Sequence, residues 1–127
     1  MISGFATAKG TKNFTVKNDS VPEKNFNVFQ ELSLSNVGVG TYLGNPDSDT
    51  DNAVKNAVKK SVLAGVNVID TAINYRAQKA ERSVGQAISE LVNENKISRD
   101  EIFISTKNGY VTTVSYTHLT LPTIYSV

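Results

Sequence analysis

Two stretches of the chain carry apolar residues at the 3.6-residue spacing of an amphipathic helix. The first begins at Ser48 or Thr50 and ends before Gly65, a residue type that commonly terminates helices. Gly85 inside the second costs about 1 kcal/mol relative to alanine, so we expect close packing there. The stripe positions are Val54, Ala57, Val58, Ser61, Val62 and Ala64 in the first, and Ala80, Val84, Ala87, Ile88, Leu91 and Val92 in the second.

Short strand-like segments precede, separate and follow the two helices. Residues 29–41 alternate between apolar and polar, which predicts a hairpin with its turn at Ser35 and Asn36. We expect the second arm of this hairpin to become the first parallel strand. Residues 67–70 and 102–105 are the next two strands. The order strand, helix, strand, helix, strand predicts an α/β fold with parallel strands and right-handed crossovers.

The two ends of the chain differ in composition from the middle. Residues 1–28 are polar and predict an N-terminal extension, either loose or covering the domain formed by residues 29–110. Residues 111–127 contain no Asp, Glu, Lys or Arg. The run 114–123 resembles the translation of a transposase adapter used in sequencing libraries, so our hypothesis is that this tail is not native sequence. An ordinary apolar strand is the alternative.

Composition and charge exclude several classes of protein. The chain has 127 residues, of which 39% are apolar and 20% charged, which suits one globular domain. Its net charge of +1 predicts neither a nucleic-acid nor a membrane partner. It has no cysteine, and we predict no metal site. No apolar run approaches the roughly 20 residues of a membrane span, and the N-terminus does not resemble a secretory signal, so we expect a cytoplasmic protein.

Three candidate catalytic residues follow the ends of predicted strands. Asp70 ends one strand, Tyr75 stands five positions later, and Lys107 follows the next strand. Because the carboxyl ends of parallel strands meet at one edge, these side chains can converge. A free tyrosine, with a pKa of about 10, is a poor acid near neutrality, and an ammonium within about 4–6 Å makes it a better one. Seen alone, each residue type more often caps a helix, packs at a rim or faces solvent.

A glycine-rich run at residues 38–44 invites comparison with a phosphate-binding loop. A dinucleotide fingerprint requires a helix that opens directly on its last glycine. Here the turn-forming residues 45–49 intervene, so we favour a role in turning and tight packing over a Rossmann-type loop.

Four sequence segments, in order and with matching spacing, together resemble the amino-terminal part of the aldo-keto reductase family over roughly residues 30–110. They are Gly38-x-Gly40-Thr41, the run GVNVIDTAINY at 65–75, Glu81-x-x-x-Gly85-x-Ala87-Ile88, and the run ISTK at 104–107. The resemblance implies a (β/α)8 barrel entered after a small hairpin. Of that barrel, this chain would supply the first three strands and two helices.

The resemblance also implies a function and a set of site residues. Tyr75 would be the general acid that protonates a carbonyl oxygen while NADPH delivers hydride to the carbon. Lys107 and Asp70 would be its partners, and Thr41, Tyr42 and Asp70 would line the nicotinamide and its ribose. The intact protein would reduce small aldehydes or ketones to alcohols, and the isolated chain is expected to be inactive.

One expected member of the family's site is missing from the matched region. The family places a histidine at the end of the fourth strand, but the only histidine here is His118, in the suspect tail, and we do not assign it. The main segments that hold NADPH in the family also come later than this chain. A non-catalytic binding or regulatory subunit, an inactive truncated chain, and an unrelated α/β domain stay open as alternatives, as does the oligomeric state.

Overall fold

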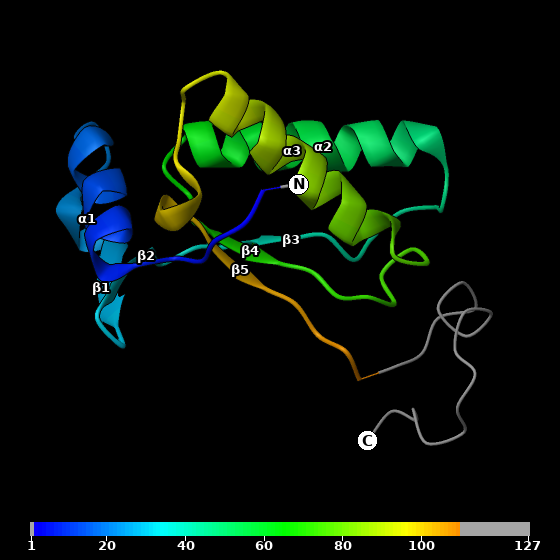
Figure 1. The fold of residues 1–127 in the computed structure, drawn as a ribbon, viewed down its shortest axis with the longest axis horizontal. Coiled ribbons are helices and arrows are strands. Elements are labelled where there is room, and N and C mark those ends of the chain that lie inside the picture. The colour runs from blue at the N-terminus through cyan, green and yellow to red at the C-terminus, as the bar shows by residue number, and fades with distance from the viewer. Residues whose placement is uncertain (1, 110–127) are drawn as a thin grey trace.

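The computed structural model describes residues 2–109, which form a parallel sheet, a hairpin, three α-helices and two short 3-10 helices (Figure 1). In chain order the elements are α1 (Ala8–Lys17), η1 (Glu23–Asn25), β1 (Phe26–Phe29), β2 (Leu32–Ser35), β3 (Val39–Gly40), α2 (Ser48–Leu63), β4 (Val68–Asp70), α3 (Lys79–Asn93), η2 (Arg99–Glu101) and β5 (Phe103–Ser105).

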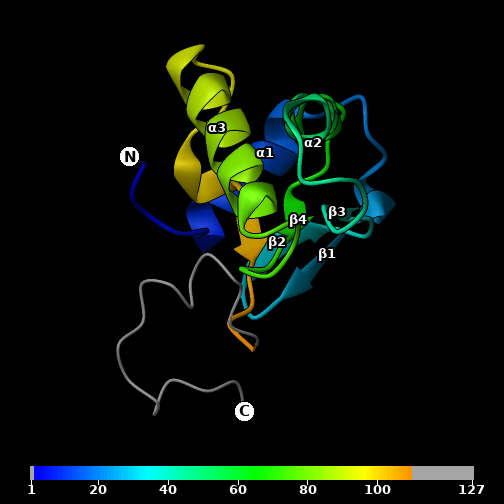
Figure 2. The same cartoon turned by 90° about the vertical axis from the view of Figure 1, so that its right-hand side faces the viewer.

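The centre of the structure is a three-stranded parallel sheet with the order β3-β4-β5. Helices α2 and α3 lie side by side across one face of this sheet, as both views show (Figures 1 and 2). The hairpin and α1 lie near the end of the sheet where β4 and β5 begin (Figure 1). The predicted alternation of helices with parallel strands is confirmed.

The apolar stripes of α2 and α3 face the sheet and each other, which places most of the core between them. In α3 the predicted stripe is buried apart from the half-buried Val92. In α2 only Val58 and Val62 are buried, and Ala57 is exposed. The core consists of Phe14, Val58, Val62, Ile69, Val84, Ala87, Ile88, Leu91, Ile97 and Ile102.

The hairpin lies earlier in the chain than the sequence pattern predicts. Strands β1 and β2 pair antiparallel, with Phe29 opposite Leu32, so the turn is formed by Gln30 and Glu31. Both turn residues have positive φ, 48° and 70°, as a tight two-residue hairpin requires. The prediction of a turn at residues 35–36 was wrong because Gln-Glu is not a pair that usually marks such turns. The hairpin is also separate from β3, which is the first parallel strand.

Within the polar N-terminal extension, α1 packs against the body of the protein. The Thr7 hydroxyl caps this helix by accepting a hydrogen bond from the amide of Gly10 (2.9 Å), and the Thr7 amide donates to the carbonyl of Asp100 (3.0 Å). Phe14 is 1% exposed and joins the core. Gly10 allows this approach, because a Cβ atom there would lie 2.3 Å from the carbonyl oxygen of Asp100.

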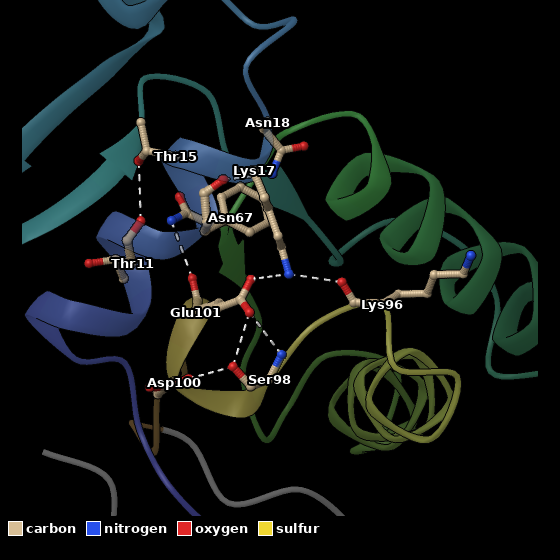
Figure 3. Close-up of polar contacts among 10 residues, drawn as sticks. Thr11, Thr15, Lys17, Asn18, Asn67, Lys96, Ser98, Asp100 and Glu101 are labelled. Carbon is tan, nitrogen blue, oxygen red and sulfur yellow. Dashed lines mark hydrogen bonds and ion pairs between the residues drawn. The ribbon is translucent and has the colours of Figure 1, made fainter.

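A polar cluster around Asn67 joins the hairpin, α1 and η2 at the amino-terminal end of the sheet, and Figure 3 shows its contacts with α1 and η2. Asn67 is fully buried, accepts from the amide of Ser35 (2.8 Å) and donates to the carbonyls of Ser33 (2.9 Å) and Glu101 (3.3 Å). The Glu101 carboxylate accepts from Ser98 and lies 2.6 Å from the Lys17 ammonium. These contacts give every polar group of the Asn67 side chain a partner, which burial requires.

Neither a membrane-crossing helix nor a metal cluster occurs among residues 2–109. No helix in that range combines the length and the apolar character needed to cross a bilayer. Over the same residues, no three His, Cys, Asp or Glu side chains gather in a way that could hold a metal ion. His118 and the adapter-like run lie outside the described residues.

Two glycine-to-alanine substitutions should have opposite effects on stability. We expect Gly10→Ala to lower the free energy of unfolding by about 1–3 kcal/mol, because the new methyl group collides with the backbone of Asp100. Gly85→Ala, also inside a helix, should raise it by about 0.5–1 kcal/mol, because a Cβ there meets no atom within 4 Å. Urea titration of the 127-residue chain measures both. Equal effects of the two substitutions on the free energy of unfolding would show that α1 does not dock as described.

The sequence-based expectation of close packing at Gly85 was wrong, because a Cβ atom there would meet no atom within 4 Å.

Candidate active site

Asp70 and Lys107 meet at the carboxyl end of the parallel sheet. Asp70 is the last residue of β4, and Lys107 follows β5 by two residues. The ladder continues past the strands, because the amide of Ile73 donates to the carbonyl of Lys107 (3.1 Å). The Lys107 ammonium therefore reaches both the Asp70 carboxylate (2.7 Å) and the carbonyl oxygen of Thr71 (2.8 Å).

Tyr75 lies beside this ion pair and contacts a second tyrosine. The Lys107 ammonium is 4.9 Å from the centroid of the Tyr75 ring, within range of a cation–π interaction. The ring of Tyr42 meets the ring of Tyr75 edge to face, with 5.0 Å between centroids and 72° between planes. Tyr75 is half-buried and Tyr42 is 63% exposed, so the two rings form an open aromatic rim.

Thr41 is a buried residue that supports the site through a hydrogen bond. It is 2% exposed, and its hydroxyl donates to the backbone carbonyl of Asp70 (2.9 Å). This bond ties the loop after β3 to the end of β4, next to the residue that holds Lys107. The five residues singled out from sequence thus form one cluster. The side chain of Thr41 is buried, and the other four are at least partly exposed.

The charge on Lys107 is stabilised by its neighbours. The hydrogen bond to the Asp70 carboxylate raises the pKa of Lys107 above its ordinary value of 10.5, partial desolvation opposes this, and the Tyr75 hydroxyl adds to the increase. Both members of the ion pair are almost half exposed, so solvent screens the interaction. The site therefore presents a charged ammonium beside the Tyr75 ring at neutral pH.

Two features of the site escape sequence reasoning. The backbone carbonyl of Thr71 binds the ammonium, and no sequence signal identifies a backbone acceptor of this kind. Arg76, the residue directly after Tyr75, is 8% exposed, and its guanidinium contacts Asp51 on α2. A single arginine in a polar loop gives no indication of burial.

Comparison with known protein families identifies the family of this chain. The model of the aldo/keto reductase family matches residues 36–120, which include all five residues of the cluster. The chain belongs to the aldo/keto reductase family. Its described strands are in keeping with the mixed α/β fold expected for an aldo/keto reductase.

Individual aldo/keto reductases resemble the chain over part of their length. It is 38% identical to an aldo-keto reductase of Bombyx mori over 72 residues, which are 56% of this chain and 22% of that protein. It is 28% identical to aldose reductase C of Dictyostelium discoideum over 90 residues, 71% of this chain and 26% of that protein. It is 31% identical to the NADH-specific methylglyoxal reductase of Escherichia coli K12 over 86 residues, 64% of this chain and 24% of that protein. The chain thus spans about a quarter of the length of these relatives.

The ion pair predicts an elevated, Asp70-dependent pKa for Lys107. Because the folded-state pKa is raised, the stabilisation is complete below pH 10.5 and is lost as the pH rises through the folded value. We expect Asp70→Asn to lower the pKa of Lys107, as measured by NMR titration of ¹³C-labelled lysine side chains. Asp49→Asn, an exposed position in the first turn of α2, is the matched control and should leave it unchanged. A pKa of Lys107 that does not change in the Asp70→Asn variant would contradict the ion pair.

Proposed function

We propose that the intact protein is an NADPH-dependent reductase that converts small aldehydes or ketones to alcohols, with Tyr75 as the general acid. The single observation that carries this proposal is the placement of the Lys107 ammonium between the Asp70 carboxylate (2.7 Å) and the Tyr75 ring (4.9 Å). Membership of the aldo/keto reductase family supplies the reaction class.

The chemistry requires a proton donor next to a carbonyl oxygen. When bound, the reduced nicotinamide supplies a hydride to the carbonyl carbon. As the carbon–oxygen π bond breaks, its electron pair moves to the oxygen, and the Tyr75 hydroxyl donates its proton there. A nearby ammonium stabilises the resulting phenolate, and Asp70 holds that ammonium in place.

The exposed surfaces of the site fit a cofactor and a small substrate. The side chains of Asp70 and Lys107 are 45% and 47% exposed, and Tyr42 presents an aromatic face beside them. A planar ring can lie against such a rim, with polar groups available for a ribose hydroxyl. We propose that Tyr42 and Asp70 hold the nicotinamide end, and that the buried Thr41 supports them through its hydrogen bond to the Asp70 carbonyl. The name of the Escherichia coli relative specifies NADH, so the choice between NADPH and NADH has to be measured.

We further propose that residues 29–110 are the start of a (β/α)8 barrel. The strand order β3-β4-β5 follows the sequence without reversal, and both helices cover the same face (Figures 1 and 2). One half of a dinucleotide-binding open sheet has the same strand order, but there the first helix opens directly on the glycine loop, whereas α2 begins at Ser48, four residues after Gly44. The arrangement therefore favours a barrel over the Rossmann-type alternative.

The barrel proposal makes a prediction about the gene. Resequencing by a route that uses no transposase adapter should replace the residues after about 113 with a sequence that encodes a third helix and a fourth strand. We expect that strand to end in a histidine. Recovery of the 114–123 run from genomic DNA would contradict the proposal that the tail is foreign.

Removal of the Tyr75 hydroxyl should abolish most of the activity. In the full-length protein, we expect Tyr75→Phe to lower kcat by roughly 10²–10⁴-fold, the usual contribution of a general acid. Nicotinamide binding, followed by fluorescence, should change little because the ring remains. The assay compares NADPH and NADH oxidation with a panel of small aldehydes and ketones. Cofactor binding without reduction by the unmodified protein would favour a non-catalytic regulatory subunit, and full activity of the variant would exclude Tyr75 as the acid.

A further inference from the structure

The segment that links Tyr75 to α3 adopts an uncommon backbone conformation. Arg76, Ala77 and Gln78 have φ values of 50°, 53° and 71°, and none of them is a glycine. Residues with a Cβ atom rarely adopt the left-handed region, least of all three in succession. Such a conformation persists only where the surrounding structure imposes it. Because the turn directly follows Tyr75, the contacts that hold it bear on the position of the Tyr75 ring.

The side chain of Arg76 supplies those contacts. It is 2% exposed, and its Nη1 atom lies 2.6 Å from the Asp51 carboxylate on α2. Longer hydrogen bonds run from Nη1 to the carbonyl of Asn45 (3.4 Å) and from Nη2 to the hydroxyl of Ser83 on α3 (3.4 Å). Nε has no partner within the described part of the chain, so the guanidinium is held by its two terminal nitrogens.

These contacts connect both tyrosines of the site. Asn45 belongs to the loop after β3, which also carries Tyr42, and Arg76 is the residue directly after Tyr75. One guanidinium thus links the two segments whose rings meet at 5.0 Å. Asp51 is held in its charged form, since the hydrogen bond from Arg76 lowers the pKa of its carboxyl. Nearly complete burial of the guanidinium makes an unpaired arginine here unfavourable.

We propose that Arg76, through its ion pair with Asp51, is a positioning residue that holds the left-handed turn and thereby sets the Tyr75 ring against the Lys107 ammonium. The proposal rests on the function proposed for Tyr75. It assigns Arg76 a role in catalysis without contact with the reacting atoms. Lysine cannot replace it fully, because a single ammonium does not reach two or three acceptors in the geometry of a guanidinium.

The first test does not depend on activity. In the full-length protein with selectively ¹³C-labelled tyrosine and lysine, nuclear Overhauser effects should connect the Tyr75 ring with the ε-methylene of Lys107. We expect Arg76→Gln and Asp51→Asn to weaken or remove these signals and Arg76→Lys to retain them in part. The matched control is Lys79→Gln, because Lys79 also contacts Asp51, at 3.4 Å, yet its side chain is 38% exposed. That variant should leave the signals unchanged.

The second test uses the kinetic parameters. If the unmodified protein is a reductase, Arg76→Gln and Asp51→Asn should lower kcat about tenfold or more while the KM values for cofactor and carbonyl change less than about threefold. Arg76→Lys should recover part of the loss, and Lys79→Gln should keep kcat within about twofold. Unchanged kcat and unchanged Overhauser effects in folded variants, with only the melting temperature lowered, would overturn the proposal.

The two tests separate this inference from the proposed function. An inactive unmodified protein, or an active Tyr75→Phe variant, would refute the function while the Overhauser effects still decide the positioning. Should Arg76→Gln fail to fold, two milder variants allow the same comparison. Asp51→Asn preserves the shape of the side chain, and Arg76→Lys preserves its charge. Retained Tyr75–Lys107 signals in both of them would count against the positioning role.

Discussion

The parallel pairing of β4 with β5 is the constraint on which both ends of the structure depend. Val68, Ile69 and Asp70 lie opposite Phe103, Ile104 and Ser105. The ladder extends backward to the carbonyl of Asn67 and forward to that of Lys107. Because side chains alternate between the faces of a sheet, a slip of one residue would turn Ile69 out of the core and separate Lys107 from Asp70.

This register divides residues 2–109 into a supporting end and an end that holds the proposed active site. Asn67, before β4, is fully buried and every polar group of its side chain has a partner. Asp70, at the other end of the same short strand, is nearly half exposed and shares its charge with Lys107. In barrel enzymes, conserved positions at the amino-terminal face of the strands support stability and those at the carboxyl face carry chemistry. Residues 67–70 show a matching separation, from the buried Asn67 to the half-exposed Asp70 of the proposed site.

The sequence predicts the features that follow from periodicity and from strand ends. Apolar spacing locates α2 and α3, because a helix with one buried face must repeat every 3.6 residues. The convergence of Asp70 and Lys107 follows from parallel strands, whose carboxyl ends share an edge. The turn at Gln30 and Glu31, the burial of Arg76 and the docking of α1 are not predictable in this way. The turn uses residue types that rarely mark a hairpin, and the other two features depend on tertiary contacts that local composition does not indicate.

The docking of α1 also has a consequence for the order of events during synthesis. Thr7 contacts Asp100 across a sequence separation of 93 residues. At a synthesis rate of about 5–20 residues per second, this separation corresponds to roughly 5–20 s between the synthesis of Thr7 and that of Asp100. During that interval Phe14, which is 1% exposed in the folded protein, lacks the part of its core cluster that Ile97 and Ile102 supply. Helix α1 is therefore synthesised before the segment against which it docks, and it can reach its place only after α2 and α3 have been made.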